Sequence, residues 1–114
     1  MANTSSFAGQ VGGIVTGIAA AGSDQAGATE LAGAFNVIAT ATGTSADGIR
    51  LPATYPLGVP LYVINTTAVA LDVFPPTGGA INGGTANAAK ALVANLSGCY
   101  VQYSSGNWGA VLSA

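Results

Sequence analysis

Alternation between apolar and polar residues predicts short β-strands through the second half of the chain. Residues 35–40 follow a period of two and are rich in β-branched and aromatic side chains, which favours a strand. The Asp-Gly pair at 47–48 predicts a turn that leads into a second strand at 49–51. Pro52 should end that strand, because proline has no N–H to donate to a neighbouring strand.

The strongest strand signal is a pair of apolar runs in the middle of the sequence. The runs at 61–64 and 69–74 are separated by residues 65–68, a length typical of a hairpin loop. The sequence therefore predicts an antiparallel hairpin, ended abruptly by the proline- and glycine-rich segment 75–79. We expect Ile81, in the turn that follows, to point inward.

The C-terminal third contains one ambiguous segment and one clear pair of strands. Residues 99–103 alternate, residues 104–107 have the composition of a hairpin loop, and residues 108–112 return as a final strand. Residues 86–96 fit either the apolar face of a helix or a short strand at 91–94. The surrounding strand signals favour the strand.

The N-terminal third is built mostly from small residues. Residues 1–13 are polar, small and glycine-containing, and they predict an extended arm. Residues 14–34 are rich in glycine, alanine, serine and threonine, and ordering such a segment costs much backbone entropy. We expect it to order by packing on a partner surface or by pairing in a sheet. A helix over 14–21 competes with this, although the nearby glycines weaken that interpretation.

These elements predict an all-β fold. About seven short strands at roughly ten-residue spacing are typical of a small antiparallel β-sandwich or a jelly-roll-like domain. A mass of 10.9 kDa fits one domain. We therefore expect an extended N-terminal arm at 1–13 and a single β-sandwich domain at 14–114.

Charge is scarce in this chain, and histidine is absent. Only 5% of the residues are charged, against about a quarter in an ordinary soluble domain. A protein near neutrality tends to associate, so the composition indicates part of a larger assembly. The six charged side chains are Asp24, Glu30, Asp47, Arg50, Asp72 and Lys90.

The sign of the charge and the hydropathy pattern exclude two classes of partner. A net charge of −2 with only two basic residues argues against nucleic acid, because phosphate binding needs clustered Lys and Arg. Mean hydropathy is positive at +0.54, but the longest apolar candidate, 11–22, is too short for a membrane span and is broken by glycines. The N-terminus also lacks the basic residue of a secretory signal.

The sequence predicts no catalytic, cofactor-binding or metal-binding residues, and no enzyme activity. Without histidine there is no Ser/His/Asp or Cys/His set and no zinc cluster. Asp24 and Glu30 share one loop-like region, but two carboxylates six residues apart are a weak signal for a calcium site. Solvated or turn-forming side chains are the favoured interpretation. The glycine-rich stretches are not followed by the Gly-Lys-Ser/Thr of a phosphate loop.

A few single residues have competing interpretations. Cys99 has apolar neighbours and no activating cation near it in sequence, which favours a small buried hydrophobe over a reactive thiol. Arg50 lies three residues after Asp47, which favours a local or intersubunit salt bridge. Core or interface packing is favoured over a carbohydrate-stacking platform for the aromatic residues Tyr55, Tyr62, Tyr100, Tyr103 and Trp108.

The order of several segments resembles a known kind of sequence. A "G-[VI]-x-L-P" strand is present at 48–52, a "V-x-N-x-x-x-x-x-L-x-V-[YF]-P" segment at 63–75, and an "I-N" turn at 81–82. This arrangement resembles small proteins encoded among the structural genes of tailed bacteriophages, and the likeness covers about residues 17–110.

The resemblance implies a virion component that is typically a homotrimer. The first hypothesis is a capsid cement, or decoration, protein that binds the major capsid protein on the outer capsid surface and stabilises the shell. Its arm, 1–13, would lie along a neighbour by strand addition. The alternative is a receptor- or glycan-binding domain of a tail or head fibre, with exposed aromatic residues as its site. The resemblance carries no catalytic residues to this chain.

Overall fold

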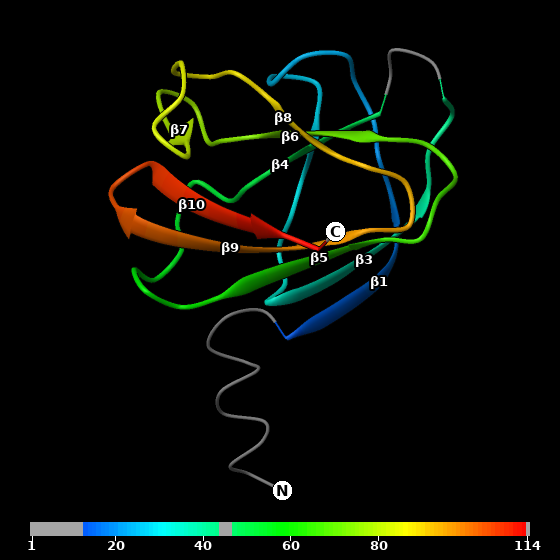
Figure 1. Ribbon diagram of the computed structural model, residues 1–114, viewed down its shortest axis with the longest axis horizontal. Helices are drawn as coiled ribbons and strands as arrows, with labels where there is room; N and C mark the ends of the chain where they lie inside the picture. Colours follow the sequence, from blue (N-terminus) through cyan, green and yellow to red (C-terminus); the bar gives the residue numbers. More distant parts are fainter. Residues whose placement is uncertain (1–12, 44–46, 114) are drawn as a thin grey trace, which may run out of the picture.

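The computed structural model describes residues 13–43 and 47–113, which form ten strands in two sheets (Figure 1). Sheet A has the strand order β1-β3-β5-β9-β10-β7, and sheet B has the order β2-β4-β6-β8. The strands are β1 Ile14–Ala19, β2 Thr29–Glu30, β3 Phe35–Thr40, β4 Gly48–Arg50, β5 Leu61–Asn65, β6 Leu71–Phe74, β7 Ala80–Ile81, β8 Lys90–Leu92, β9 Ser97–Ser104 and β10 Asn107–Leu112.

The first six strands alternate between the two sheets. The chain passes from β1 in sheet A to β2 in sheet B, then from β3 to β4 and from β5 to β6. Each such pair is one turn of a coil, and successive turns stack in parallel. Ile14 pairs with Phe35 and Phe35 pairs with Tyr62 in sheet A, while Ile49 pairs with Val73 in sheet B. This is the arrangement of a β-solenoid with three turns.

The C-terminal strands end the parallel stack with antiparallel pairing. β8 runs antiparallel to β6 in sheet B, and β9 runs antiparallel to β5 in sheet A. β10 forms a hairpin with β9, and β7 lies on the far side of β10. The parallel stack therefore ends where β8 and β9 pair with it. Among the described residues, β1 and β2 are the edge strands at the N-terminal end, and β7 and β8 are those at the other end.

The all-β prediction is confirmed, but the antiparallel sandwich or jelly-roll arrangement is wrong. The expected hairpin does not form, because β5 and β6 belong to different sheets. The buried Asn65 turns the chain between them: its Oδ1 accepts hydrogen bonds from the Thr67 N–H and hydroxyl, and its Nδ2 donates to the Val69 carbonyl. Residues 65–70 are therefore a corner between sheets.

Most of the individual strands lie where the alternation placed them. Residues 35–40 form β3, and the C-terminal hairpin consists of β9 and β10. The two open choices are settled as strands, because β1 pairs with β3 and β8 pairs with β6. Ile81 points inward, at 5% exposure. The arm expected at 1–13 lies outside the described residues except for Gly13, whose carbonyl accepts hydrogen bonds from Ala34 and Phe35 N–H groups.

The hydrophobic core fills the space between the two sheets. It is lined by inward residues of both sheets and closed by two aromatic side chains from the C-terminal hairpin. Its buried members are Ala20, Leu31, Ile38, Ile49, Leu51, Leu61, Val63, Leu71, Val73, Ile81, Leu92, Tyr100 and Trp108. No helix long and apolar enough to cross a membrane occurs within residues 13–43 and 47–113.

Candidate interaction surface

The acidic residues do not gather into a site for chemistry. Asp24 accepts a hydrogen bond from the Gly27 N–H at 2.9 Å, so it is a turn-forming side chain, as predicted. Asp47 is 5% exposed, and its carboxylate accepts hydrogen bonds from the backbone N–H groups of Thr42 and Gly43. Among the residues that the structure describes, no group of three or more Asp, Glu, Cys or His side chains could hold a metal ion.

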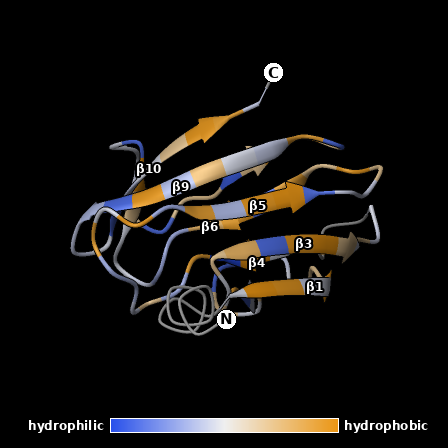
Figure 2. Ribbon diagram, turned by 90° about the horizontal axis from the view of Figure 1, so that it is seen from below, coloured by the Kyte–Doolittle hydropathy of each residue, from blue (hydrophilic) through white to orange (hydrophobic). Residues whose placement is uncertain are grey.

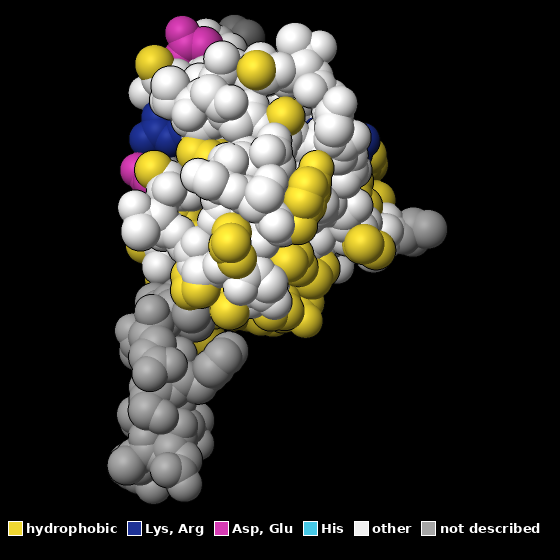
Figure 3. All heavy atoms as spheres, turned by 90° about the vertical axis from the view of Figure 1, so that its left-hand side faces the viewer, with side chains coloured by type: hydrophobic (Ala, Val, Ile, Leu, Met, Phe, Trp, Pro, Cys, Tyr) yellow, Lys and Arg dark blue, Asp and Glu magenta, His cyan; other side chains and the backbone are white. Residues whose placement is uncertain are grey.

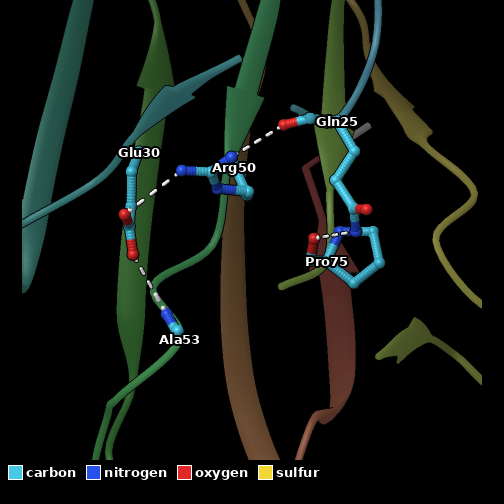
Figure 4. Close-up of polar contacts among 5 residues, drawn as sticks. All are labelled: Gln25, Glu30, Arg50, Ala53 and Pro75. Atoms are coloured by element: carbon cyan, nitrogen blue, oxygen red, sulfur yellow. Dashed lines mark hydrogen bonds and ion pairs between the residues drawn. The ribbon is translucent and has the colours of Figure 1, made fainter. Parts of the chain in front are cut away.

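Arg50 pairs with Glu30 rather than with Asp47, which corrects the expected local salt bridge (Figure 4). The guanidinium of Arg50 lies 3.2 Å from Oε1 of Glu30 and also donates to the Gln25 carbonyl at 2.8 Å. The second oxygen of Glu30 accepts from the Ala53 N–H, and the Gln25 amide donates to the Pro75 carbonyl. These bonds join successive turns of the solenoid, so the cluster stabilises the stacking of sheet B.

The aromatic residues divide into a core set and a surface set. Trp108 and Tyr100 are at most 1% exposed, and Tyr55 packs on Trp108 with ring centroids 5.7 Å apart. Burial raises the pKa of both Tyr100 and Tyr55, because the phenolate form loses solvation. Tyr62 and Tyr103 instead lie exposed on sheet A, at 42% and 59%. Packing therefore accounts for the first set but leaves the second set free for a partner.

Figure 2 shows the strands of sheet A side by side, with their hydrophobic segments in orange. One row of side chains crosses the outer face of this sheet, from the edge strand β1 to the C-terminal hairpin. Backbone register places Ile14 beside Phe35, Phe35 beside Tyr62, Tyr62 beside Cys99, and Cys99 beside Val111. The rings of Phe35 and Tyr62 are 5.9 Å apart between centroids. We call these five residues the apolar row.

The side chains of the apolar row are more exposed to solvent than hydrophobic side chains usually are. Ile14 and Val111, at its two ends, are 74% and 75% exposed, and Phe35 in the interior is 39% exposed. The expectation that Cys99 is fully buried is wrong, since its side chain is half-buried on this outer face. Sheets that face water on one side normally carry polar residues there. An apolar outer face is therefore typical of a surface that a partner covers.

Four of the six charged side chains lie in the strands of sheet B, and the other two lie in the segments that lead into that sheet. Glu30, Arg50, Asp72 and Lys90 are in β2, β4, β6 and β8, one in each strand of that sheet. Asp47 directly precedes β4, and Asp24 lies between β1 and β2. Figure 3 shows one side of this division, with charged side chains in the upper part and hydrophobic ones along the lower border. The strands of sheet A carry no charge.

The apolar row was not found from the sequence, although its signal was present. Ile14, Phe35, Tyr62, Cys99 and Val111 are each one apolar residue in a short strand. What joins them is strand pairing, and the antiparallel hairpin that we expected gives different neighbours. The confinement of charge to every second strand is visible in the sequence once the alternation between sheets is known.

Comparisons with protein-family models, with curated proteins and with solved structures found no match to this chain.

Proposed function

We propose that this protein is a viral structural protein, a capsid cement or decoration protein that binds the outer capsid surface as a homotrimer and stabilises the shell. The observation that supports this best is the division between an apolar, charge-free sheet A and a charged sheet B. Such a molecule is suited to having one side covered by protein and the other in water. The resemblance of residues 17–110 to phage structural proteins supplies the capsid as the setting.

The proposed mechanism is geometric. A small trimer that contacts several major capsid subunits at once makes each further contact effectively intramolecular, so weak contacts add to a firm hold. This needs no catalytic group. Three of the described acidic residues have structural roles, since Asp24 and Asp47 accept hydrogen bonds from backbone N–H groups and Glu30 pairs with Arg50. The arm predicted at 1–13 is the segment that we propose binds along a neighbour by strand addition.

The experiment that tests this function is the copy number of the protein in purified virus particles, measured by quantitative mass spectrometry against the major capsid protein. A ratio near one copy per capsid subunit supports a lattice-covering cement protein. Only a few copies per particle would favour a fibre or vertex component. Absence from the particles would overturn the virion assignment.

The arm is tested separately by deleting residues 1–12. The deletion should end there, because the Gly13 carbonyl accepts hydrogen bonds from Ala34 and Phe35. We expect the shortened protein to keep its fold and oligomeric state and to bind capsids more weakly. Unchanged occupancy on capsids would contradict a role for the arm.

The second candidate function is a receptor- or glycan-binding domain of a tail or head fibre. The observation in its favour is the exposure of Tyr62 and Tyr103 on one sheet face, because exposed aromatic rings are the groups that stack on sugars. Glycan-array binding that is lost in Tyr62→Ala and Tyr103→Ala, with low copy number per particle, would favour this alternative.

A further inference from the structure

We infer that the outer face of sheet A is the surface through which copies of this chain associate with one another. The trimeric stoichiometry rests on the proposed function, but the choice of surface does not. The inference begins from the apolar row, which extends without interruption across five adjacent strands. Its neighbours on the same face, Val37 and Ile64, are apolar as well, and register pairs them directly.

The size of this face suits a moderate interface. Five strands at a spacing of about 4.8 Å, each with about five residues at about 3.3 Å, give a flat area on the order of 400 Å². That lies within the range of about 300–600 Å² for the largest apolar patches on monomeric proteins, patches that are often functional. This flat area is about half of the ~800 Å² of accessible surface that each partner buries in a standard interface. Projecting side chains and residues at the rim would add to the buried area. We therefore expect association that depends on concentration.

The charge pattern favours a second copy as the occupant. In an assembly of identical chains, residues close to the symmetry axis meet their own copies, so a charge there would face a like charge. The apolar row and its neighbours carry none. A strongly charged partner would find no complementary group on this face. The charged residues that lie in strands, two acidic and two basic, are all in sheet B.

The edge strand β1 lies within this face and adds to the argument. It has no fully buried side chain, and among the described residues its only sheet neighbour is β3. An uncovered edge strand without charge or proline is a known hazard for uncontrolled pairing. Packing of sheet A against other copies would place β1 inside an assembly.

The test uses the purified full chain in the absence of capsids, followed by sedimentation velocity over a range of micromolar concentrations. Val111→Glu places a charge at one end of the apolar row. The Val111 side chain is 75% exposed, so replacing it should leave the fold intact. The matched control is Val93→Glu, the same change at a 53% exposed valine just after β8 of sheet B. We expect wild type and Val93→Glu to associate, and Val111→Glu to associate about tenfold more weakly or not at all.

A second variant and a second readout keep the result independent of any effect on folding. Ile14→Glu acts at the opposite end of the apolar row, and circular dichroism should show unchanged strand content. Cys99 is the one cysteine of the sequence and belongs to the apolar row, so its alkylation rate reports whether the face is covered. We expect alkylation to be slow in associated wild type and several-fold faster in Ile14→Glu.

Several results would overturn the inference. These are a monomeric wild type at all concentrations, full association of both row variants, or loss of association in Val93→Glu alone. A monomer whose Cys99 is still protected would indicate that another segment of the same chain covers the face. A monomer in which Val111→Glu abolishes capsid binding would indicate that the capsid covers it. Absence of the protein from virus particles would end the proposed function but would leave these outcomes unaffected.

Discussion

At the scale of single residues, buried asparagines hold the corners and strands of the coil together. Asn65 is 1% exposed, and its amide donates to the carbonyls of Val69, Leu92 and Val93. It thereby links β5 to the chain leaving β8, across the two sheets. Asn36, fully buried in β3, bonds in a similar way to the carbonyls of Gly33 and Tyr62. Both side chains satisfy backbone groups that would otherwise be buried without partners.

Replacing Asn65 with alanine should destabilise the protein substantially. The change leaves the buried carbonyls served by Nδ2 and the Thr67 N–H short of a partner, and each such group costs about 1–3 kcal/mol. We expect Asn65→Ala to lower the free energy of unfolding by about 3 kcal/mol in urea titrations. Asn107→Ala is the matched control, because that amide donates to the partly buried Ser104 hydroxyl and to no other group among the described residues, and it should cost less than about 1 kcal/mol. Equal losses would contradict the assigned role of Asn65.

The buried tyrosine of the core predicts a loss of stability at alkaline pH. Burial raises the pKa of Tyr100 above its ordinary value of 10.0, with Tyr55 shifted in the same direction. The folded state therefore holds the phenolic proton more tightly than the unfolded state does. This contribution is complete below the unfolded pKa and is lost as the pH rises from about 10 toward the folded pKa.

We expect the unfolding free energy to fall above pH 10 by up to about 1.4 kcal/mol per pH unit for this residue. Thermal or urea unfolding measures this decline between pH 8 and pH 11, a range that extends from about two units below to about one unit above the ordinary tyrosine pKa. Tyr100→Phe removes the titrating group while keeping the ring, so its decline should be shallower. A decline of the same slope in wild type and Tyr100→Phe would assign the effect to other groups.

At the scale of elements, the C-terminal end of the solenoid depends on a close backbone contact between the loop before β7 and the loop of the β9–β10 hairpin. Gly79 lies just before β7, and a Cβ placed on it would collide with the backbone carbonyl of Gly106 in the β9–β10 hairpin. Its neighbour Gly78 has a φ of +83° but open space around it. The two adjacent glycines are therefore needed for different reasons, one for packing and one for conformation.

The adjacent glycines allow a direct comparison of these two costs. Gly78→Ala should cost about 1–2 kcal/mol, the penalty of a left-handed conformation for a residue with a Cβ. Gly79→Ala should cost more, because the backbone of the hairpin must move to admit the methyl group and cannot rotate aside as a side chain would. Chemical denaturation of both variants measures the order. The reverse order would mean that β7 does not pack closely on the hairpin.

The same scale explains how far the sequence predicted this fold. Period-two alternation identified β3, β9 and β10, because a strand with one buried face requires it wherever its neighbours lie. Alternation does not identify those neighbours. The segment at 65–68 has the length of a hairpin loop, and only the buried bonds of Asn65 reveal it as a corner. The stacked partners Ile14, Phe35 and Tyr62 recur at unequal intervals, which hides the repeat.

At the scale of the whole molecule, the candidate surface depends on strand pairing more than the fold does. Composition alone predicted association, through the scarcity of charge. The location of the surface required knowing that alternate strands belong to alternate sheets, since this alone separates the charged Glu30 and Arg50 from the apolar Phe35 and Tyr62. The prediction that the chain associates, which comes from composition, and the wrong prediction of an antiparallel sandwich, which comes from loop length, therefore rest on independent features.

The solenoid architecture also predicts that stability is graded along the stack. β5 lies between β3 and β9, and three of its five residues are buried. β1 has no buried residue and, within the part of the chain that the structure describes, pairs with β3 alone. In a stacked fold each turn is stabilised mainly by its neighbours, so the turn at the open end should open locally before the rest. Two backbone amides report this: Asn65 N–H donates to Leu96 at 3.0 Å, and Ala20 N–H donates to Thr40 at 2.9 Å.

We expect native-state hydrogen exchange to distinguish these amides although their bond lengths are nearly equal. Asn65 should exchange only through global unfolding, and Ala20 at least about tenfold faster through local opening of the first turn. The comparison is made on the monomeric Ile14→Glu variant, so that association does not protect the edge. Slow exchange of Ala20 in that variant would mean that β1 is held by something other than β3. Slow exchange in wild type alone would indicate that association itself orders the open end.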